Sequence, residues 1–232
     1  MKKIIPQSNL RLALRATFAT LLILGVGSFF GSVTTVAQTI ESFDASGELP
    51  DGWKIDATRP GPRLPAWEVV QEPGAKSAPN VLTLTDTYGG TGQRYNLVWN
   101  TDISLKNGEI EVDVRGNAGK EDQGGGPMWR VLDANNYYVA RYNPLENNFR
   151  LYVVKDSKRS EIASAEGLAI KAGQWFTIRV EQDGNHINAW LDGRWLIDVD
   201  DDTLTDAGGV GFWTKADAET TFDNLSVESF DD

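Results

Sequence analysis

The sequence predicts an all-β protein, an antiparallel two-sheet sandwich of the jelly-roll type. Short segments in which apolar and polar residues alternate recur through residues 38–232, and clusters of Gly, Asp and Asn separate them at short intervals. No segment of that region has the apolar spacing of a strong helix. Ten or more short strands separated by such turns are typical of sandwiches and jelly rolls.

The chain opens with an expected secretory signal. Four basic residues precede the apolar run of residues 16–30, and Thr35 and Ala37 place small side chains before a cleavage point at Gln38. The run is interrupted by glycines and is shorter than the roughly 20 residues of a membrane span. We therefore expect residues 1–37 to be a signal peptide, residues 38–232 to be one jelly-roll domain, and the product to be secreted or periplasmic, with no membrane attachment after cleavage.

The predicted strands follow in order after a Pro-rich segment, Asp56–Lys76, that we interpret as a loop or lid. In the segment 108–115 the apolar residues Ile110, Val112 and Val114 share one parity, which predicts one face on the core and one in water. The Asp-Gly pairs of QDGN and LDGRW are strong hairpin signals. The clearest predicted strands are Val81–Thr85, Gly108–Arg115, Met128–Leu132, Tyr137–Asn143, Phe149–Val154, Trp175–Gln182, Ile187–Leu191, Trp195–Val199, Val210–Thr214 and Thr221–Glu228.

Charge and cysteine content exclude some classes of function. Removal of the signal's four basic residues leaves 18 Lys and Arg against 33 Asp and Glu, a net charge of −15. A chain this acidic is not primarily a binder of nucleic acid or of anionic membranes. It contains no cysteine, so it must be stable without disulfides.

Four stretches of the sequence resemble a known family. They are FDASGELPDGW (43–53), NNYYVARYNPLENNFRLYVVKDSKR (135–159), AGQWFTIRVEQDGNHINAWLDGRWLIDVDD (172–201) and GGVGFWTKADAETTFDNLSV (208–227). They are similar to the concanavalin A-like, laminin-G-like jelly rolls of the 3-keto-disaccharide hydrolase-like family, often labelled family 16 glycoside hydrolase-like. The resemblance implies a two-sheet sandwich and a carbohydrate partner, and it leaves the reaction open.

The parity of the strands suggests where a carbohydrate would bind. If Tyr138, Ala140 and Tyr142 face the core, the alternate residues of neighbouring strands share the opposite, concave face. Arginine, lysine and asparagine hydrogen-bond hydroxyls, and aromatic faces stack on sugar rings. The predicted ligand-binding residues are Arg130, Arg141, Asn143, Arg150, Trp213 and Lys215. The alternative is that these residues form a salt-bridge network with Glu146, Asp133 or Glu111 that only solvates the sheet.

Catalytic signals are weak. Glu109, Glu111 and Asp113 project from one face of a predicted strand, but not in the order that glycoside hydrolases of this fold use. His186 is the only histidine, and no nucleophile elbow is present. Whether the protein is an enzyme stays open, with a hydrolase or lyase acting on glycans or 3-keto-glycosides as the alternative to a carbohydrate-binding protein.

A structural calcium ion is also expected. First and last strands of jelly rolls commonly lie side by side, which would bring Asp44 close to Asp223. Carboxylates and backbone carbonyls of the 45–48 turn are ligands that calcium prefers. The alternative is that both aspartates cap turns without a metal.

Overall fold

The computed structural model describes residues 38–41, 43 and 47–230. These residues form fifteen β-strands and no helix, so they contain no helix that could cross a membrane. The strands are β1 (Gln38–Glu41), β2 (Trp53–Thr58), β3 (Ala66–Gln71), β4 (Asn80–Asp86), β5 (Tyr95–Leu105), β6 (Gly108–Ala118), β7 (Gly125–Asp133), β8 (Asn136–Asn143), β9 (Asn148–Lys155), β10 (Lys158–Glu166), β11 (Trp175–Asp183), β12 (His186–Leu191), β13 (Arg194–Asp200), β14 (Gly208–Lys215) and β15 (Glu219–Ser229).

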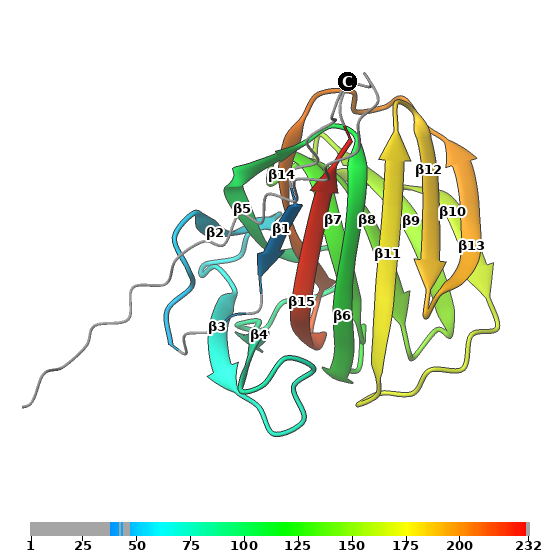
Figure 1. The fold of residues 1–232 in the computed structure, drawn as a ribbon. Coiled ribbons are helices and arrows are strands. Elements are labelled where there is room, and N and C mark those ends of the chain that lie inside the picture. The colour runs from blue at the N-terminus through cyan, green and yellow to red at the C-terminus, as the bar shows by residue number, and fades with distance from the viewer. Residues whose placement is uncertain (1–37, 42, 44–46, 231–232) are drawn as a thin grey trace, which may run out of the picture.

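The strands form two antiparallel sheets packed face to face (Figure 1). The front sheet, here sheet A, has the order β13-β12-β11-β6-β15-β4-β3, with β1 added beside β15. The rear sheet, here sheet B, has the order β10-β9-β8-β7-β14-β5-β2. The predicted antiparallel two-sheet sandwich is confirmed.

All ten strands expected from alternation are present, and the LDGRW turn has the expected geometry. Asp192 and Gly193 both have positive φ, 47° and 72°, as a two-residue hairpin turn of the primed type requires.

The interpretation of residues 56–76 as a loop is wrong, because β2 ends and β3 lies within that segment. The first described strand does pair with the last, with Glu41 opposite Leu225.

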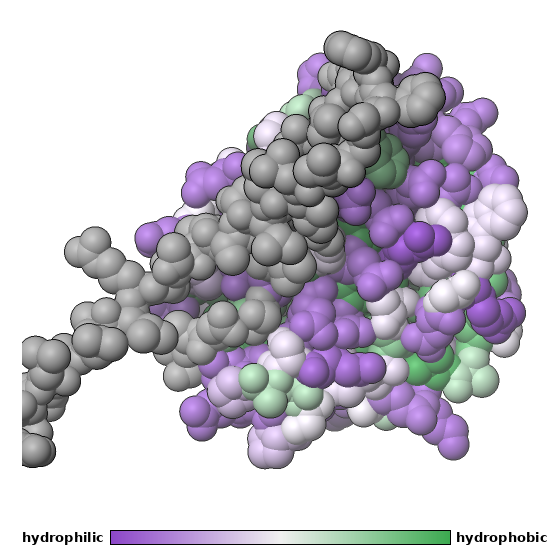
Figure 2. Space-filling view, viewed as in Figure 1, coloured by the Kyte–Doolittle hydropathy of each residue, from purple (hydrophilic) through white to green (hydrophobic). Residues whose placement is uncertain are grey.

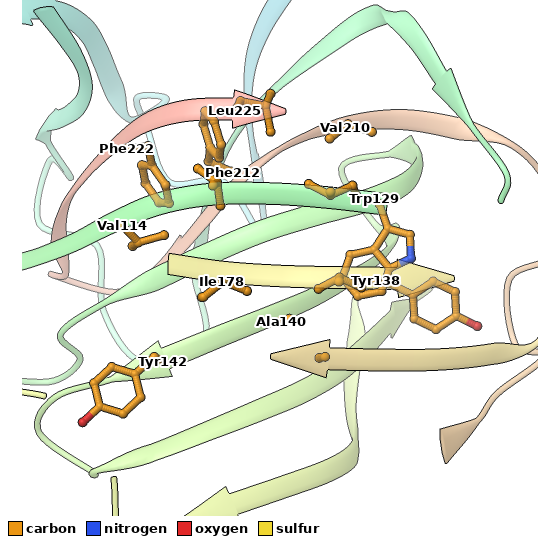
Figure 3. Close-up of a cluster of buried hydrophobic side chains, with 14 of the residues drawn as sticks. Val114, Trp129, Tyr138, Ala140, Tyr142, Ile178, Val210, Phe212, Phe222 and Leu225 are labelled. Carbon is orange, nitrogen blue, oxygen red and sulfur yellow. The ribbon is translucent and has the colours of Figure 1, made fainter. Parts of the chain in front are cut away.

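The main core lies between the sheets (Figure 3). Phe212 of sheet B stacks on Phe222 of sheet A, with ring centroids 4.4 Å apart. Ile110, Val112 and Val114 face this core as predicted. Full burial of one such side chain stabilises the fold by about 1.5–3 kcal/mol. The buried residues therefore fix which face of each strand points to the core, and the alternate residues point away from it.

The far face of sheet B, here called the concave face, carries a second apolar cluster. The hydroxyl of Thr58 on edge strand β2 contacts the Tyr137 hydroxyl at 2.8 Å and donates to the Ala134 carbonyl. Arg59 reaches the Ser157 carbonyl in the β9–β10 turn. The cluster comprises Tyr95, Leu97, Trp99, Met128, Val131, Ala134, Tyr137, Val139, Tyr152, Val154 and Trp213.

Candidate functional site

The β8–β9 hairpin places a group of polar side chains on the concave face, beside the second cluster. Arg141 lies opposite Arg150, and Asn143 lies opposite Asn148. Residues paired in this way share one face of a sheet. The same parity that puts Tyr142 into the core therefore turns the two arginines outward, as the sequence predicted.

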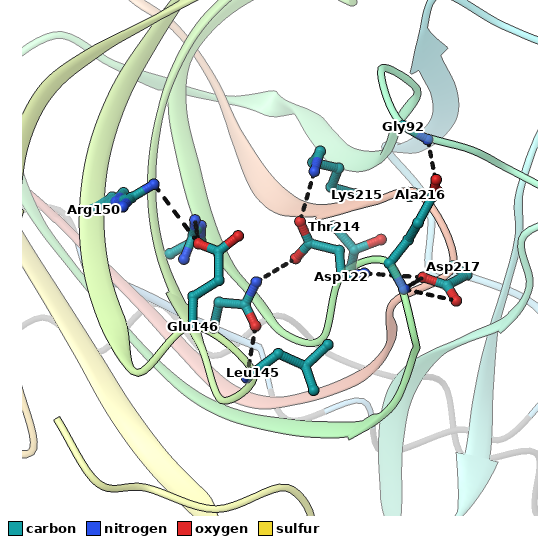
Figure 4. Close-up of polar contacts among 12 residues, drawn as sticks. Gly92, Asp122, Leu145, Glu146, Arg150, Thr214, Lys215, Ala216 and Asp217 are labelled. Carbon is teal, nitrogen blue, oxygen red and sulfur yellow. Dashed lines mark hydrogen bonds and ion pairs between the residues drawn. The ribbon is translucent and has the colours of Figure 1, made fainter. Parts of the chain in front are cut away.

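Five residues of this hairpin form a connected group, here called the arginine cluster: Arg141, Glu146, Asn148, Arg150 and Tyr152. Arg141 is nearly fully buried, and its Nη2 lies 2.8 Å from Glu146 Oε2. Glu146 is at the surface, in the β8–β9 turn (Figure 4). A buried guanidinium therefore holds an accessible carboxylate in place.

Arg150 is the accessible cation of the arginine cluster. Its side chain is 28% exposed and lies within 4 Å of three carboxylates, those of Glu146, Glu161 and Glu166. The salt-bridge alternative correctly named Glu146 as a partner. It was wrong for Asp133, which accepts hydrogen bonds from neighbouring asparagines, and for Glu111, which belongs to sheet A.

The ionisation of the arginine cluster follows from its contacts. Burial alone would raise the pKa of Glu146, but the charge of Arg141, the hydrogen bonds from Arg141 and Asn148 and the charge of Arg150 together outweigh burial and lower that pKa below its usual value. The hydrogen bond to Tyr152 raises the pKa of Arg150 above its usual value. The carboxylate of Glu146 therefore stays ionised below the ordinary glutamate pKa, down to its own lowered value.

Tyr152 lies between the two arginines. Its phenol oxygen accepts hydrogen bonds from Arg141 Nη2 at 3.2 Å and from Arg150 Nη1 at 3.4 Å. No acceptor for the phenol proton is present among the described residues. Nε of Arg141 is also buried without a hydrogen-bond partner there. Unsatisfied buried donors are rare and call for an explanation, which is often a functional one.

A third arginine, Arg159, covers the aromatic part of the concave face. Its guanidinium lies 4.2 Å from the ring centroid of Tyr152, 5.2 Å from that of Tyr95 and 5.7 Å from that of Trp213. Trp213 is on the predicted face but is fully buried. Gly126 is its cross-strand neighbour in β7 and adds no side chain beside the ring.

Lys215 and Asn143 form a second polar group on this face, joined through a residue that sequence reasoning missed. Both donate to the buried carboxylate of Asp122, at 2.9 Å from each nitrogen (Figure 4). Asp122 is held in the β6–β7 loop because Asp217 accepts its backbone N–H. Lys215 is therefore paired with a carboxylate and mostly buried.

Arg130 does not join the other predicted site residues. It has a φ of 45° and lies at an irregularity in the pairing of β7. Side chains beyond this point turn to the other face of the sheet, so Trp129 packs in the main core and Val131 in the second cluster. Its guanidinium is buried and donates to the carbonyls of Lys106, Gly184 and Leu204. The predicted outward position of Arg130 is wrong, because a local bulge cannot be read from alternation.

The acidic residues considered for catalysis lie on the other side of the molecule. Glu109 of β6 pairs with Arg179 of β11 at 3.0 Å, and Asp113 accepts from Thr177. Both belong to sheet A, on its outer face. They cannot act together with the arginine cluster on one bound sugar.

The predicted calcium ligands are only partly within the described residues. Asp223 is fully buried and accepts hydrogen bonds from the backbone and hydroxyl of Ser77 and from the backbone of Asn224. These donors account for its burial. Asp44 lies outside the described residues, which contain no group of three or more acidic, histidine or cysteine side chains that could hold a metal. The shared calcium stays a prediction.

Most of the chain matches one protein family. Residues 38–228 match the 3-keto-alpha-glucoside-1,2-lyase-like domain. The chain belongs to this family. The match begins at the residue expected to follow signal cleavage. Curated proteins gave no match to the chain.

Solved structures share the fold of this family member at low sequence identity. Carbohydrate binding module CBM66 from Bacillus subtilis is 20% identical, with a TM-score of 0.60 over 77% of this chain and 96% of its own. A GH16 protein from Bacteroides ovatus, in complex with a G4G4G3G product, is 8% identical, with a TM-score of 0.58 over 81% of this chain and 98% of its own. The GH43 protein BlXynB from Bacillus licheniformis, as its K247S mutant, is 14% identical, with a TM-score of 0.58 over 82% of this chain and 39% of its own.

Proposed function

We propose that this protein binds a carbohydrate on the concave face, through the arginine cluster. The observation that carries the proposal is the pairing of accessible polar groups with buried ones. Arg150 and Glu146 reach the surface, while Arg141 beneath them is almost completely buried. Donors and acceptors that are already oriented lose little freedom when a ligand binds.

The chemistry of the arginine cluster suits sugar hydroxyls. A guanidinium offers donors in a fixed fork, and a carboxylate accepts from two neighbouring hydroxyls. The covered aromatic rings of Tyr95 and Trp213 supply a rigid floor beneath Arg159. The likeness in fold to a carbohydrate binding module and to a product-bound GH16 protein supports this class of ligand.

Replacing Arg150 with alanine tests the proposal. A hydrogen bond from a charged donor is worth about 1.5–3 kcal/mol, so affinity for a bound oligosaccharide should fall about tenfold or more. The melting temperature should change little, because surface ion pairs contribute about 0–1 kcal/mol each. Calorimetric titration of gluco-, xylo- and galacto-oligosaccharides measures the affinity.

Arg194→Ala is the matched control, because Arg194 is exposed on sheet A. It should leave affinity unchanged. Equal affinity of the parent and Arg150→Ala for every oligosaccharide that binds would show that the arginine cluster is a structural network and that the ligand binds elsewhere.

A second candidate function is elimination from a 3-keto-glycoside, and the position of Tyr152 favours it. In this reaction a base takes the proton from C2, a C1–C2 double bond forms, the bond from C1 to the glycosidic oxygen breaks, and that oxygen takes up a proton. Tyr152, whose proton has no acceptor among the described residues, would protonate the leaving oxygen. Arg150 would stabilise negative charge on the 3-keto oxygen, and Glu146 would accept the C2 proton.

Export completes the proposed function. The family match starting at residue 38 supports removal of residues 1–37. Mass spectrometry of the protein from the periplasm or culture medium should show a chain that begins at Gln38. An intact chain recovered in the membrane fraction would contradict export and release.

We also propose that Asp44 and Asp223 share a structural calcium ion. The pairing of β1 with β15 supports this, because it brings the start of the domain close to Asp223. An ion that binds only the folded state raises its stability by mass action. The melting temperature should therefore fall when a chelator is added and recover with calcium, but not in Asp223→Ala. Identical melting of the parent with and without chelator would exclude the ion.

A further inference from the structure

Two tryptophans lie side by side on the outer face of sheet A, away from the concave face. Trp190 of β12 and Trp195 of β13 are cross-strand partners. Ala189 and Leu191, on either side of Trp190, face the core, so Trp190 points outward. A register shift in the β12–β13 pairing lets Trp195 share that face, although Ile197 faces the core. Trp195 is 59% exposed, the highest value among the exposed large hydrophobic side chains of the described residues.

Both rings are held in place by polar contacts. Nε1 of Trp195 lies 3.0 Å from Asn188 Oδ1 and 3.0 Å from the Ile197 carbonyl, so the polar edge of the indole is bound to the sheet. The guanidinium of Arg179 lies 3.8 Å from the ring centroid of Trp190 and is itself bound by Glu109. The pair, here called the tryptophan platform, therefore presents aromatic surface to solvent, and the N–H of the more exposed ring is already hydrogen-bonded to the sheet.

The charges around the tryptophan platform restrict what can cover it. Asn188 lies between Glu181 and Asp198 across the three strands, and Asp200 follows beside His186. Figure 2, which views this side, shows a mostly hydrophilic surface with pale side chains over β11–β13. Nucleic acids and acidic glycans would be repelled by these carboxylates, and a second copy of the chain would bring the same charges to the contact.

A neutral polysaccharide fits what remains. Its sugar rings present flat C–H faces to an indole, and its hydroxyls hydrogen-bond carboxylates such as Asp198 without a charge of their own. Tryptophan is a rigid side chain that offers a large contact area at low entropic cost. We propose that the tryptophan platform binds a neutral polysaccharide chain, separately from the site on the concave face. One molecule would then hold a polymer on one side while the arginine cluster binds a sugar on the other.

The test is binding of the folded protein to neutral polymers, compared between the parent and Trp195→Ala. The probes are microcrystalline cellulose and chitin in pull-down assays, and mixed-linkage β-glucan, xylan and dextran in affinity gels. Loss of a central tryptophan from a contact is among the largest single effects in binding surfaces. We expect affinity for at least one polymer to fall about tenfold or more. The melting temperature should stay the same, because Trp195 is mostly exposed.

Two controls separate this inference from the concave site. Leu132→Ala removes another exposed hydrophobic residue, 46% exposed and on sheet B, and should bind the polymer like the parent. Arg150→Ala should also retain polymer binding. Polymer binding that is unchanged in Trp195→Ala, no binding to any of the five polymers, or self-association that Trp195→Ala abolishes would each overturn the proposal. The last result would show a protein interface instead.

Discussion

Replacing Tyr152 with phenylalanine should lower the rate of elimination from a 3-keto-glycoside about 10²–10⁴-fold, the usual contribution of a positioned proton donor. The change removes one oxygen and keeps the ring that stacks with Arg159. The two lost hydrogen bonds come from charged donors and are worth about 1.5–3 kcal/mol each before the structure relaxes. The variant should remain folded, because Arg141 and Arg150 both keep their ion pairs with Glu146. The unsaturated 3-keto product can be followed by its ultraviolet absorbance with a 3-keto-disaccharide as substrate.

Tyr142→Phe is the control for this prediction. Tyr142 also loses contacts, to the Leu168 carbonyl and to both backbone groups of Ile170, but it faces the core rather than the concave face. It should be less stable and equally active. A Tyr152→Phe variant with more than half of the parent rate would exclude Tyr152 as proton donor. A parent protein that releases no product would remove the elimination reaction and leave carbohydrate binding untouched.

Replacing Arg130 with alanine should lower the free energy of unfolding by about 3–5 kcal/mol. Three backbone carbonyls would lose a charged donor, and each such hydrogen bond is worth about 1.5–3 kcal/mol before the structure relaxes. Arg130→Lys should recover only part of the loss, because an ammonium cannot reach three directions as a planar guanidinium does. Urea unfolding followed by tryptophan fluorescence measures the change.

Arg194→Ala again serves as the control and should change stability by no more than about 0.5 kcal/mol, as surface substitutions do. If Arg130→Ala instead unfolds like the parent and loses affinity for oligosaccharides, Arg130 faces the ligand, as its parity in the sequence suggested.

The sequence predicts most of the strands, and burial alone does not decide which: β8 is buried on both faces and was predicted, whereas β3 carries an exposed Glu68 and was missed. Strand β5 was missed because Val98 faces the main core while Leu97 and Trp99 face the second cluster, so no alternation is visible. Strand β10 was missed for the opposite reason, since it is a mostly exposed edge strand.

The sequence predicted the site residues whose position depends only on the face of the strand to which they point. Arg141 and Arg150 lie where parity places them, and Tyr152 shares that parity but was not recognised. Asp122 comes from a loop and Arg159 folds back over the sheet, and neither position follows from strand periodicity. Both positions depend on contacts between segments far apart in the sequence, such as the ion pair of Asp122 with Lys215.

The pairing of β1 with β15 has a consequence for how the protein is made. Residues 38–41 find their partners only in residues 225–228, so the sheet cannot be completed before almost the whole chain has been synthesised. Contacts between such distant segments form slowly, since a long loop must first be closed. If residues 1–37 direct export as proposed, this late pairing means that the chain reaches a translocation channel before sheet A is complete.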